Sequence, residues 1–254
     1  MFFILNFEKN NMVYSQFLEA KQKNKKQFAV LIDPDKTNLA KLETLLFLSK
    51  DNIIDYWFVG GSLLTNDTLD ESIKYLKKHS NIPVVLFPGN YMQINRNADG
   101  ILFLSLISGR NPEMLIGKHV IAAPYLKKTS LEIIPTGYML IDSGRATSAQ
   151  YISHTLPIPS DKNDIAVCTA MAGEMLGMAC MYLEAGSGAV YPVPLDMIEK
   201  VSKNISVPLI VGGGIDTAEK AKKACIAGAD IIVVGNAIEK DNNLIKEISS
   251  AIHS

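Results

Sequence analysis

Glycines that follow two apolar runs form the clearest candidate ligand site in this 254-residue chain. The first group lies in Val211-Gly-Gly-Gly-Ile-Asp216, and the second is Gly235-Asn236. Glycine lets the backbone approach a ligand closely and turn its N–H groups toward an anion. We therefore expect these two glycine elements to bind a phosphate group. The alternative is that these glycines only form tight turns.

A carboxylate within a third glycine-rich segment is the candidate catalytic group. The segment is Tyr182-Leu-Glu-Ala-Gly-Ser-Gly188, at the end of another apolar run. Glu184 at a strand end could hold a hydroxyl group or take its proton. Tyr182 has the same parity along the strand and should face the same side. The alternative is a structural glutamate paired with a nearby base.

An acid and a hydroxyl at two further strand ends are typical of a site for a hard cation. Asp33 follows the run Phe28–Ile32, and Ser62 follows Val59-Gly-Gly. Oxygen ligands of this kind suit Mg²⁺. Asp33 could instead be a capping or salt-bridged residue, and Ser62 a helix cap. We expect Asp35 to be a turn or capping residue.

Composition and missing motifs exclude several other classes. Hydrophobic residues make up 48% of the chain, charged residues 20%, and the net charge is −1, which indicates a globular protein without broad nucleic-acid binding. The dinucleotide motif GxGxxG does not follow the first strand. The four histidines lie outside the strand-end motifs, which argues against a His-based triad or zinc site. We expect all three cysteines to be buried thiols in a cytoplasmic protein: Cys168, Cys180 and Cys225.

Eight short apolar runs that alternate with helical patterns predict the elements that position these residues. Continuous apolar runs indicate parallel strands covered on both faces, and their number predicts a (β/α)8 barrel of class α/β. The predicted strands are 28–32, 56–59, 83–87, 100–104, 137–141, 180–183, 207–211 and 230–234. The connection Pro88–Asp99 is short and rich in Asn, so we expect the third helix to be missing or reduced.

The predicted organisation is an N-terminal extension and first helix over residues 1–26, followed by one barrel domain over residues 27–254. Helices are expected over 38–50, 67–79, 112–125, 164–178, 194–201, 217–227 and 244–252. The stretch 142–162, rich in Ser, Thr and Pro, is expected to be a mobile lid or a solvated loop. No apolar run reaches the ~18 residues that a membrane span needs.

Six motifs together give the chain a resemblance to a known family. They are Leu31-Ile-Asp-Pro-Asp-Lys36, Gly60-Gly-Ser62, Phe87-Pro-Gly-Asn90, Tyr182–Gly188, Gly212-Gly-Gly214 and Gly235-Asn236. Over nearly the whole chain the sequence resembles geranylgeranylglyceryl phosphate synthase and its bacterial relatives, the PcrB-like enzymes. That resemblance implies a modified TIM barrel without the third helix.

The resemblance also implies a reaction and roles for residues. The enzyme would be a prenyltransferase that joins sn-glycerol 1-phosphate to geranylgeranyl diphosphate as an ether. Mg²⁺ would be bound by Asp33 and Ser62. Our mechanistic hypothesis for this reaction is that Glu184 takes the proton from the 3-hydroxyl. The substrate contacts would be Tyr182, Leu183, Glu184, Ala185, Gly186, Ser187, Gly188, Gly213, Gly214, Gly235 and Asn236. The partners would be these two substrates and further copies of the chain, in a dimer or hexamer.

Two other functions remain open from the sequence. One is an isomerase, lyase or aldolase that acts on a small phosphorylated substrate, because many barrels share a phosphate site. The other is a binding protein without catalysis. Some relatives carry a basic residue where this chain has Leu31. Either the chain belongs to the other branch of the family, or its diphosphate contacts come from elsewhere, for which Lys36 and Arg96 are candidates. For the prenyl tail, we expect an apolar groove near 88–99 and 102–114.

Overall fold

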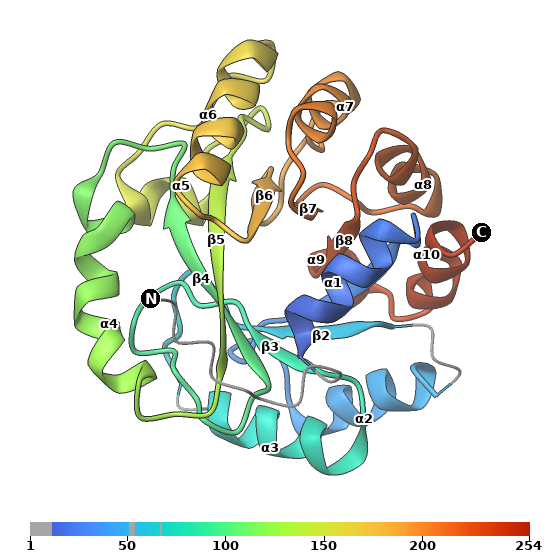
Figure 1. Cartoon of the computed structure of the whole chain (residues 1–254). Coiled ribbons are helices and arrows are strands. Elements are labelled where there is room, and N and C mark those ends of the chain that lie inside the picture. Colours follow the sequence, from blue (N-terminus) through green and yellow to red (C-terminus); the bar gives the residue numbers. More distant parts are fainter. Residues whose placement is uncertain (1–11, 51–53, 67) are drawn as a thin grey trace.

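A closed barrel of eight parallel strands forms the body of the protein (Figure 1). The structure is a computed structural model that describes residues 12–50, 54–66 and 68–254. Each strand pairs with its neighbours in chain order, and β8 pairs with β1. The strands are β1 Gln27–Ile32, β2 Tyr56–Val59, β3 Val84–Leu86, β4 Gly100–Leu106, β5 Glu132–Leu140, β6 Cys180–Glu184, β7 Leu209–Gly212 and β8 Ile231–Val234.

All eight predicted strands are present, and β5 differs most from the expectation. It begins at Glu132 rather than Gly137, because β4 and β5 pair continuously from Gly100 opposite Glu132 to Leu106 opposite Tyr138. Polar and proline residues at the start of β5 interrupt its apolar run, so hydrophobicity alone missed these residues. Both strands extend beyond the short β3.

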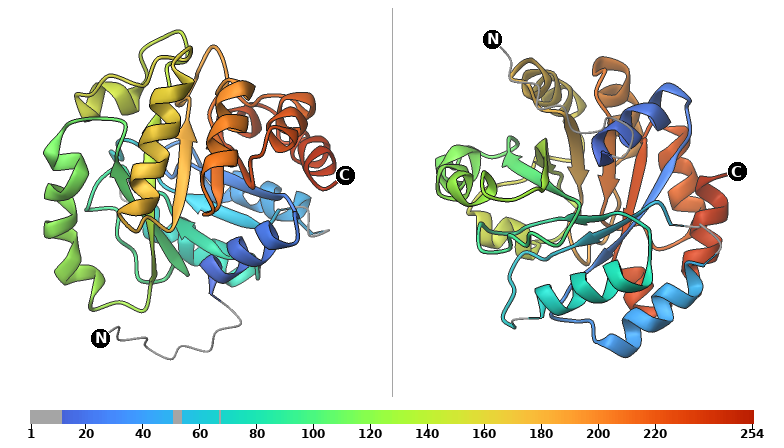
Figure 2. Two further views of the ribbon diagram at one scale, coloured as in Figure 1. Left: turned by 45° about the horizontal axis from the view of Figure 1, so that its top comes forward. Right: turned by 60° about the horizontal axis from the view of Figure 1, so that its bottom comes forward.

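Helices surround the barrel on its outer side (Figure 2). Side-chain caps from Asn38, Thr147 and Thr217 begin three of the described helices, each accepting a hydrogen bond from a backbone N–H three residues later. Asp67, the expected cap of the second predicted helix, lies outside the described residues. The helices are α1 Val13–Gln22, α2 Leu39–Leu48, α3 Leu69–His79, the π-helix η1 Glu113–Gly117, α4 Lys118–Leu126, α5 Ser148–Ser153, α6 Asn163–Met175, α7 Leu195–Asn204, α8 Ala218–Ile226, α9 Asn236–Lys240 and α10 Leu244–Ile252.

Helix α1 closes the amino-terminal end of the barrel and crosses the front of Figure 1. Its Phe17 is fully buried and contacts Tyr56 edge to face, with ring centroids 4.9 Å apart. The Glu132 carboxylate accepts hydrogen bonds from the backbone N–H groups of Val13 and Tyr14, at 2.6 and 3.1 Å. Ligands therefore have to enter at the opposite, carboxyl-terminal end, where barrel active sites lie.

The expectation of a missing third helix is confirmed. Residues 87–99, all of them described, connect β3 to β4 without a helix. Figure 1 shows this extended connection between α3 and α4. A gap is thereby left in the helical layer beside β3 and β4.

Several smaller expectations are also decided by the structure. The stretch 142–162 contains helix α5 and a bridge between Ile141 and Ile158, so it is more ordered than a plain loop. Cys180 and Cys225 are buried as expected, but Cys168 is exposed on α6. Each helix in the described part of the chain is too short or too polar to cross a membrane. Residues 1–11 of the predicted N-terminal extension lie outside the described residues.

Candidate active site

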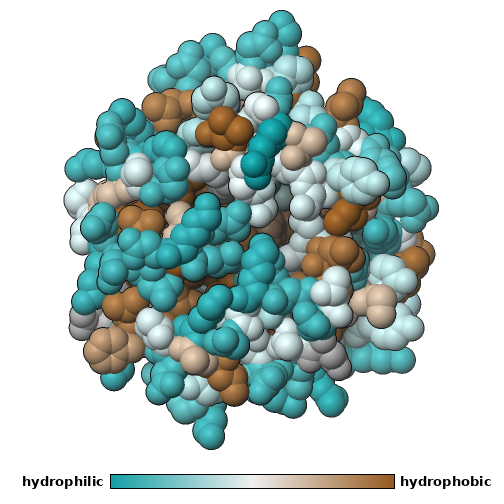
Figure 3. All heavy atoms as spheres, turned by 180° about the vertical axis from the view of Figure 1, so that it is seen from behind, coloured by the Kyte–Doolittle hydropathy of each residue, from teal (hydrophilic) through white to brown (hydrophobic). Residues whose placement is uncertain are grey.

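A large cavity of about 1010 Å³ opens at the carboxyl-terminal end of the barrel. Figure 3 looks onto this end, opposite α1, where apolar side chains lie between polar ones. The cavity brings together the motifs from β1, β2, β6, β7 and β8. Its lining includes Asp33, Ser62, Tyr182, Glu184, Gly186, Ser187, Gly188, Gly213, Gly214, Gly235 and Asn236.

Two residues of the predicted substrate segment do not line the cavity. Leu183 and Ala185 belong to the outer core between strands and helices. Alternation along β6 is the reason, since successive side chains point to opposite faces of a strand. Tyr182 and Glu184 point inward. Ala185 joins the site only through its backbone, whose N–H donates to the carbonyl of Gly212 at 3.0 Å.

The Glu184 carboxylate is buried and its chemistry is tuned by that burial. Its side chain lies at the end of β6, and Oε1 accepts a hydrogen bond from the Gly186 N–H at 2.6 Å. Burial raises the pKa of Glu184 from 4.5 to about 7, although the Gly186 hydrogen bond opposes the rise. A carboxyl group with a pKa near neutrality can accept a proton from a substrate hydroxyl and release it again.

Gly213 is tightly enclosed beside this carboxylate. Its φ of +81° favours glycine, and a Cβ there would lie 2.6 Å from Glu184 Oε1 and 2.5 Å from the Gly186 nitrogen. The backbone can come this close to the carboxylate only without a side chain. The glycines after β7 therefore serve the geometry of the site as well as its turns.

We expect Gly213→Ala to reduce turnover strongly while the barrel still folds, because the added methyl group displaces both the Glu184 carboxylate and the Gly186 backbone beside it. Steady-state kinetics together with thermal melting would test this. Gly228→Ala, in the turn before β8, introduces a comparable strain at φ +117° far from the cavity. Equal losses of activity in the two variants would contradict a local role for Gly213.

A pair of hydrogen bonds joins the loops after β6 and β8. The Asn236 side-chain amide donates to Ser187 Oγ at 2.9 Å, and Ser187 Oγ lies 3.3 Å from Asn236 Oδ1. Both residues border the cavity beside Gly188, Gly214 and Gly235. This contact holds the predicted phosphate-binding glycines from different strands in one concave surface.

Asp33 and Ser62 follow the ends of adjacent strands, because β1 and β2 pair with Ile32 opposite Val59. Lys36 Nζ contacts Asp33 Oδ2 at 2.8 Å. The loop that carries Ser62 is fixed by the buried Gln93 side chain, which donates to the Gly61 carbonyl at 2.8 Å and accepts from the Gly89 N–H at 3.1 Å. Gln93 thus ties the ends of β2 and β3 together, a role that the sequence did not indicate.

The donor set at Asp33 and Ser62 fits Mg²⁺. Across residues 12–50, 54–66 and 68–254, no cluster of three or more His, Cys, Asp or Glu side chains could hold a metal ion. A fully protein-ligated zinc site is therefore not supported there. One carboxylate and one hydroxyl suit Mg²⁺, which keeps waters and is often completed by substrate phosphates.

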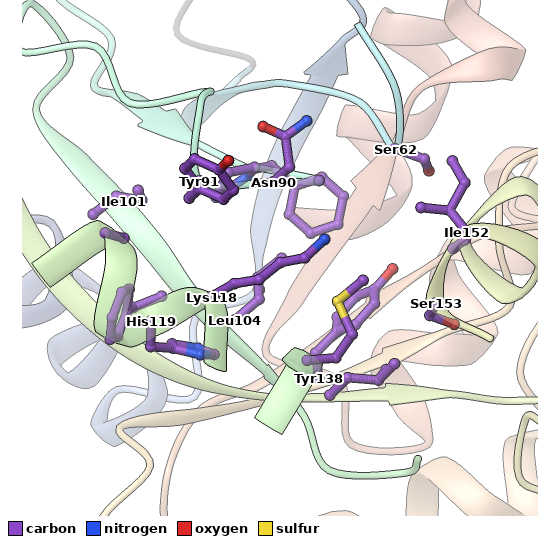
Figure 4. Close-up of a pocket in the computed structure, with 18 of the residues that line it drawn as sticks. Ser62, Asn90, Tyr91, Ile101, Leu104, Lys118, His119, Tyr138, Ile152 and Ser153 are labelled. Atoms are coloured by element: carbon purple, nitrogen blue, oxygen red, sulfur yellow. The ribbon is translucent and has the colours of Figure 1, made fainter. Parts of the chain in front are cut away.

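A second, apolar groove joins the first cavity and runs between β4, the 87–99 connection and α4 (Figure 4). It occupies the gap left by the missing third helix. The two hollows share lining residues, namely Gly61, Ser62, Phe87, Tyr138, Ala149 and Ile152. Phe87 stacks on Tyr182 where they meet, with ring centroids 5.3 Å apart and planes 12° from parallel.

Helix α5 and the residues before it cover the junction of these hollows. Ala149 and Ile152 of α5 face both of them. Tyr191 donates its backbone N–H to the Ser143 carbonyl at 3.2 Å, and the Arg145 guanidinium lies against Gly188. The contacts of 143–152 with the β6 loop were not foreseen, because they join segments distant in sequence. The composition of residues 142–162, rich in Ser, Thr and Pro, predicted only a loop or lid at this place.

Comparisons with known proteins agree with this arrangement. The PcrB family matches residues 21–252 of the chain. Geranylgeranylglyceryl phosphate synthase of Chitinophaga pinensis is 56% identical over 245 residues, which are 96% of this chain and 97% of that protein. The synthase of Spirosoma linguale is 54% identical over 232 residues, or 91% and 93% of the two chains.

A solved structure is similar over the same extent. The crystal structure of (S)-3-O-geranylgeranylglyceryl phosphate synthase from Thermoplasma acidophilum, in complex with substrate sn-glycerol-1-phosphate, matches with a TM-score of 0.89 and 32% identity. The match covers 95% of this chain and 98% of that one. Because the family match, the sequence relatives and this solved structure agree, the chain belongs to the PcrB family.

Proposed function

We propose that this chain is a Mg²⁺-dependent prenyltransferase that joins the 3-hydroxyl of sn-glycerol 1-phosphate to geranylgeranyl diphosphate as an ether and releases diphosphate. The main structural support is that a polar, glycine-lined cavity meets an apolar groove beside the buried Glu184. The cavity suits a small phosphorylated alcohol, and the groove suits a hydrocarbon tail. A small soluble phosphorylated substrate alone would leave the groove without a purpose.

The glycerol phosphate is assigned to the cavity between β6, β7 and β8. Backbone N–H groups around Gly214 and Gly235 would bind the phosphate, as helix starts and glycine loops do in many barrels. Ser187 and Asn236 lie at the edge of the same surface. In this orientation the glycerol hydroxyls point toward Tyr182 and Glu184, at the centre of the barrel mouth.

The proton chemistry is assigned to Glu184. The 3-hydroxyl oxygen forms the new C–O bond to the allylic carbon of the prenyl chain, the bond from that carbon to the diphosphate oxygen breaks, and the hydroxyl proton passes to the Glu184 carboxylate. The Tyr182 hydroxyl is buried beside the Glu184 carboxylate, and its interaction with that carboxylate opposes the rise in the pKa of Glu184. It is placed to orient a substrate hydroxyl. Phe87 and Tyr138 shield the reacting carbon from water.

The diphosphate is assigned to the edge of the cavity near Asp33 and Ser62. These two oxygen donors would hold Mg²⁺, whose chemistry when bound is to neutralise charge on the departing diphosphate. The Lys36 ammonium, which is paired with the Asp33 carboxylate, adds a positive charge at the same edge of the cavity. Lys36 therefore acts mainly through Asp33.

The pKa of Glu184 leads to a pH prediction. The base form exists only above the pKa, so log kcat/KM for glycerol 1-phosphate should fall with unit slope below about pH 7, since kcat/KM reports groups of the free enzyme. The phosphate group itself titrates near pH 6. The control is the same pH profile of kcat/KM measured on Glu184→Gln. That profile should keep the fall caused by protonation of the substrate phosphate and lose the fall near pH 7 caused by Glu184. Wild-type activity that is flat between pH 6 and 8 would contradict the assignment.

A transfer assay tests the proposed reaction. Labelled sn-glycerol 1-phosphate, Mg²⁺ and prenyl diphosphates of increasing length are mixed with the protein, with EDTA and sn-glycerol 3-phosphate as controls. We expect metal-dependent transfer of label into an organic-extractable lipid, selective for the 1-phosphate. No lipid product at any chain length, from protein that still binds phosphate ligands, would contradict the proposal and favour a soluble phosphorylated substrate.

We also propose that the enzyme works in the cytoplasm as a homo-oligomer, a dimer or a hexamer. The three cysteines are free thiols in the structure, which suits a reducing compartment. Light scattering on the purified protein would measure the assembly, and a monomer at micromolar concentration would contradict it.

A further inference from the structure

The apolar groove contains one ammonium group that the roles assigned so far do not use. Lys118 is the first residue of α4 and lines the groove together with Ile101, Leu104, Ala122 and Leu126. In Figure 4 its side chain extends into the middle of the groove, toward the side where Ser62 and Ile152 lie. Among the described residues, no carboxylate oxygen lies within 4.0 Å of its Nζ.

Contacts between α4 and β4 fix the height of Lys118 along the barrel. Ser105 Oγ donates to the Leu115 carbonyl at 2.9 Å, and the His119 ring contacts the Phe103 ring with centroids 4.4 Å apart. The chain from η1 into α4 thus runs antiparallel to β4. Lys118 consequently lies beside the Phe103–Leu104 level of the strand.

Lys118 lies at the part of the groove nearer the predicted metal site. Ser62 and Lys118 line the same groove, and Figure 4 shows the Lys118 side chain directed toward the side where Ser62 lies. Ala122 and Leu126 follow Lys118 by one and two helical turns, and they line the deeper part of the groove.

The two basic residues suggested by the sequence are placed less well for an anion in this groove. Lys36 is already paired with Asp33 at 2.8 Å and lines the polar cavity, not the groove. Arg96 faces a separate surface hollow with Asp70 and Lys74. Neither supplies a free cation at the groove mouth.

We propose that the Lys118 ammonium binds the diphosphate group of the prenyl substrate, on the side opposite Asp33, and so fixes which end of the substrate stays at the groove mouth. This inference rests on the proposed prenyltransferase function. Lys118 is half-buried, and its ammonium group, without a carboxylate partner at the edge of an apolar groove, favours an anionic ligand there. A tail bound along Ala122 and Leu126 would leave its diphosphate at the level of Lys118.

Lys118→Met tests the proposal, because methionine keeps the unbranched apolar stem and removes the charge. We expect KM for the prenyl diphosphate to rise about 10–100-fold, the value of one hydrogen bond to a charged group. KM for glycerol 1-phosphate and the melting temperature should be unchanged. Lys118→Arg should restore most of the affinity. Lys127→Met, at the exposed end of the same helix, is the matched control and should behave as wild type.

Calorimetric titration with inorganic diphosphate in the presence of Mg²⁺ makes this test independent of turnover. Lys118→Met should bind inorganic diphosphate more weakly by a similar factor. Equal binding by wild type, Lys118→Met and Lys127→Met would overturn the role of Lys118, whatever the reaction. If the wild type forms no ether lipid, the proposed function fails, while the titration still decides whether Lys118 is an anion contact.

Discussion

Glu184→Gln is expected to lower turnover by about 10²–10⁴-fold, the usual contribution of a general base. Glutamine keeps the size of the side chain and an oxygen that can accept the Gly186 hydrogen bond, so the loss isolates the proton transfer. The substrate should still bind, because the glycine surface is unchanged. Single-turnover transfer of labelled glycerol phosphate measures the effect.

The control for this variant is its stability. Burial raises the pKa of Glu184 above its unfolded value, so the protonated form is favoured in the folded state and stability falls as pH rises from 4.5 through about 7. Glu184→Gln should therefore melt no lower than wild type at pH 8. Turnover within about tenfold of wild type, below the range expected for a general base, would remove Glu184 from that role.

Asp33→Asn is expected to reduce turnover on the order of 10²–10³-fold, because a bound metal contributes several kcal/mol of charge stabilisation. The single carboxylate paired with Ser62 would be lost, so the Mg²⁺ concentration for half-maximal activity should rise. Affinity for glycerol 1-phosphate should change little, since that substrate is assigned to β6, β7 and β8. Activity titrated with Mg²⁺ at saturating substrates provides the measurement.

Asp35→Asn is the matched control for the metal site. Asp35 accepts hydrogen bonds from the backbone and hydroxyl of Thr65 and from the Asn66 N–H, so it caps the loop as expected from the sequence. Its replacement should lower stability without changing the Mg²⁺ dependence. An unchanged Mg²⁺ dependence in Asp33→Asn as well would contradict the assigned metal site.

Much of the scaffold and of the polar cavity could be predicted from sequence because the signals are local. Short apolar runs end in glycine or acidic residues, and parallel strands bring all those ends to one rim. Tyr182 and Glu184 share a parity, so one strand orients both. The missing third helix followed from the length and composition of Pro88–Asp99.

The apolar groove and the α5 segment that covers it could not be predicted from the sequence and became visible only in the folded structure. Tyr138 lines both hollows because it pairs with Tyr182 across β5 and β6, but no motif marks it. Gln93 and Ile152 act through contacts between segments far apart in sequence. Lys118 in the sequence is one lysine among many, and only the path of α4 along β4 places it in the groove.

A crystal structure with sn-glycerol 1-phosphate, Mg²⁺ and an unreactive prenyl thiodiphosphate would test the central claim most directly. We predict the phosphate on the glycines after β7 and β8, the 3-hydroxyl within hydrogen-bond distance of Glu184, and the prenyl tail between β4 and α4. A tail bound outside this groove, or a hydroxyl directed away from Glu184, would contradict the account.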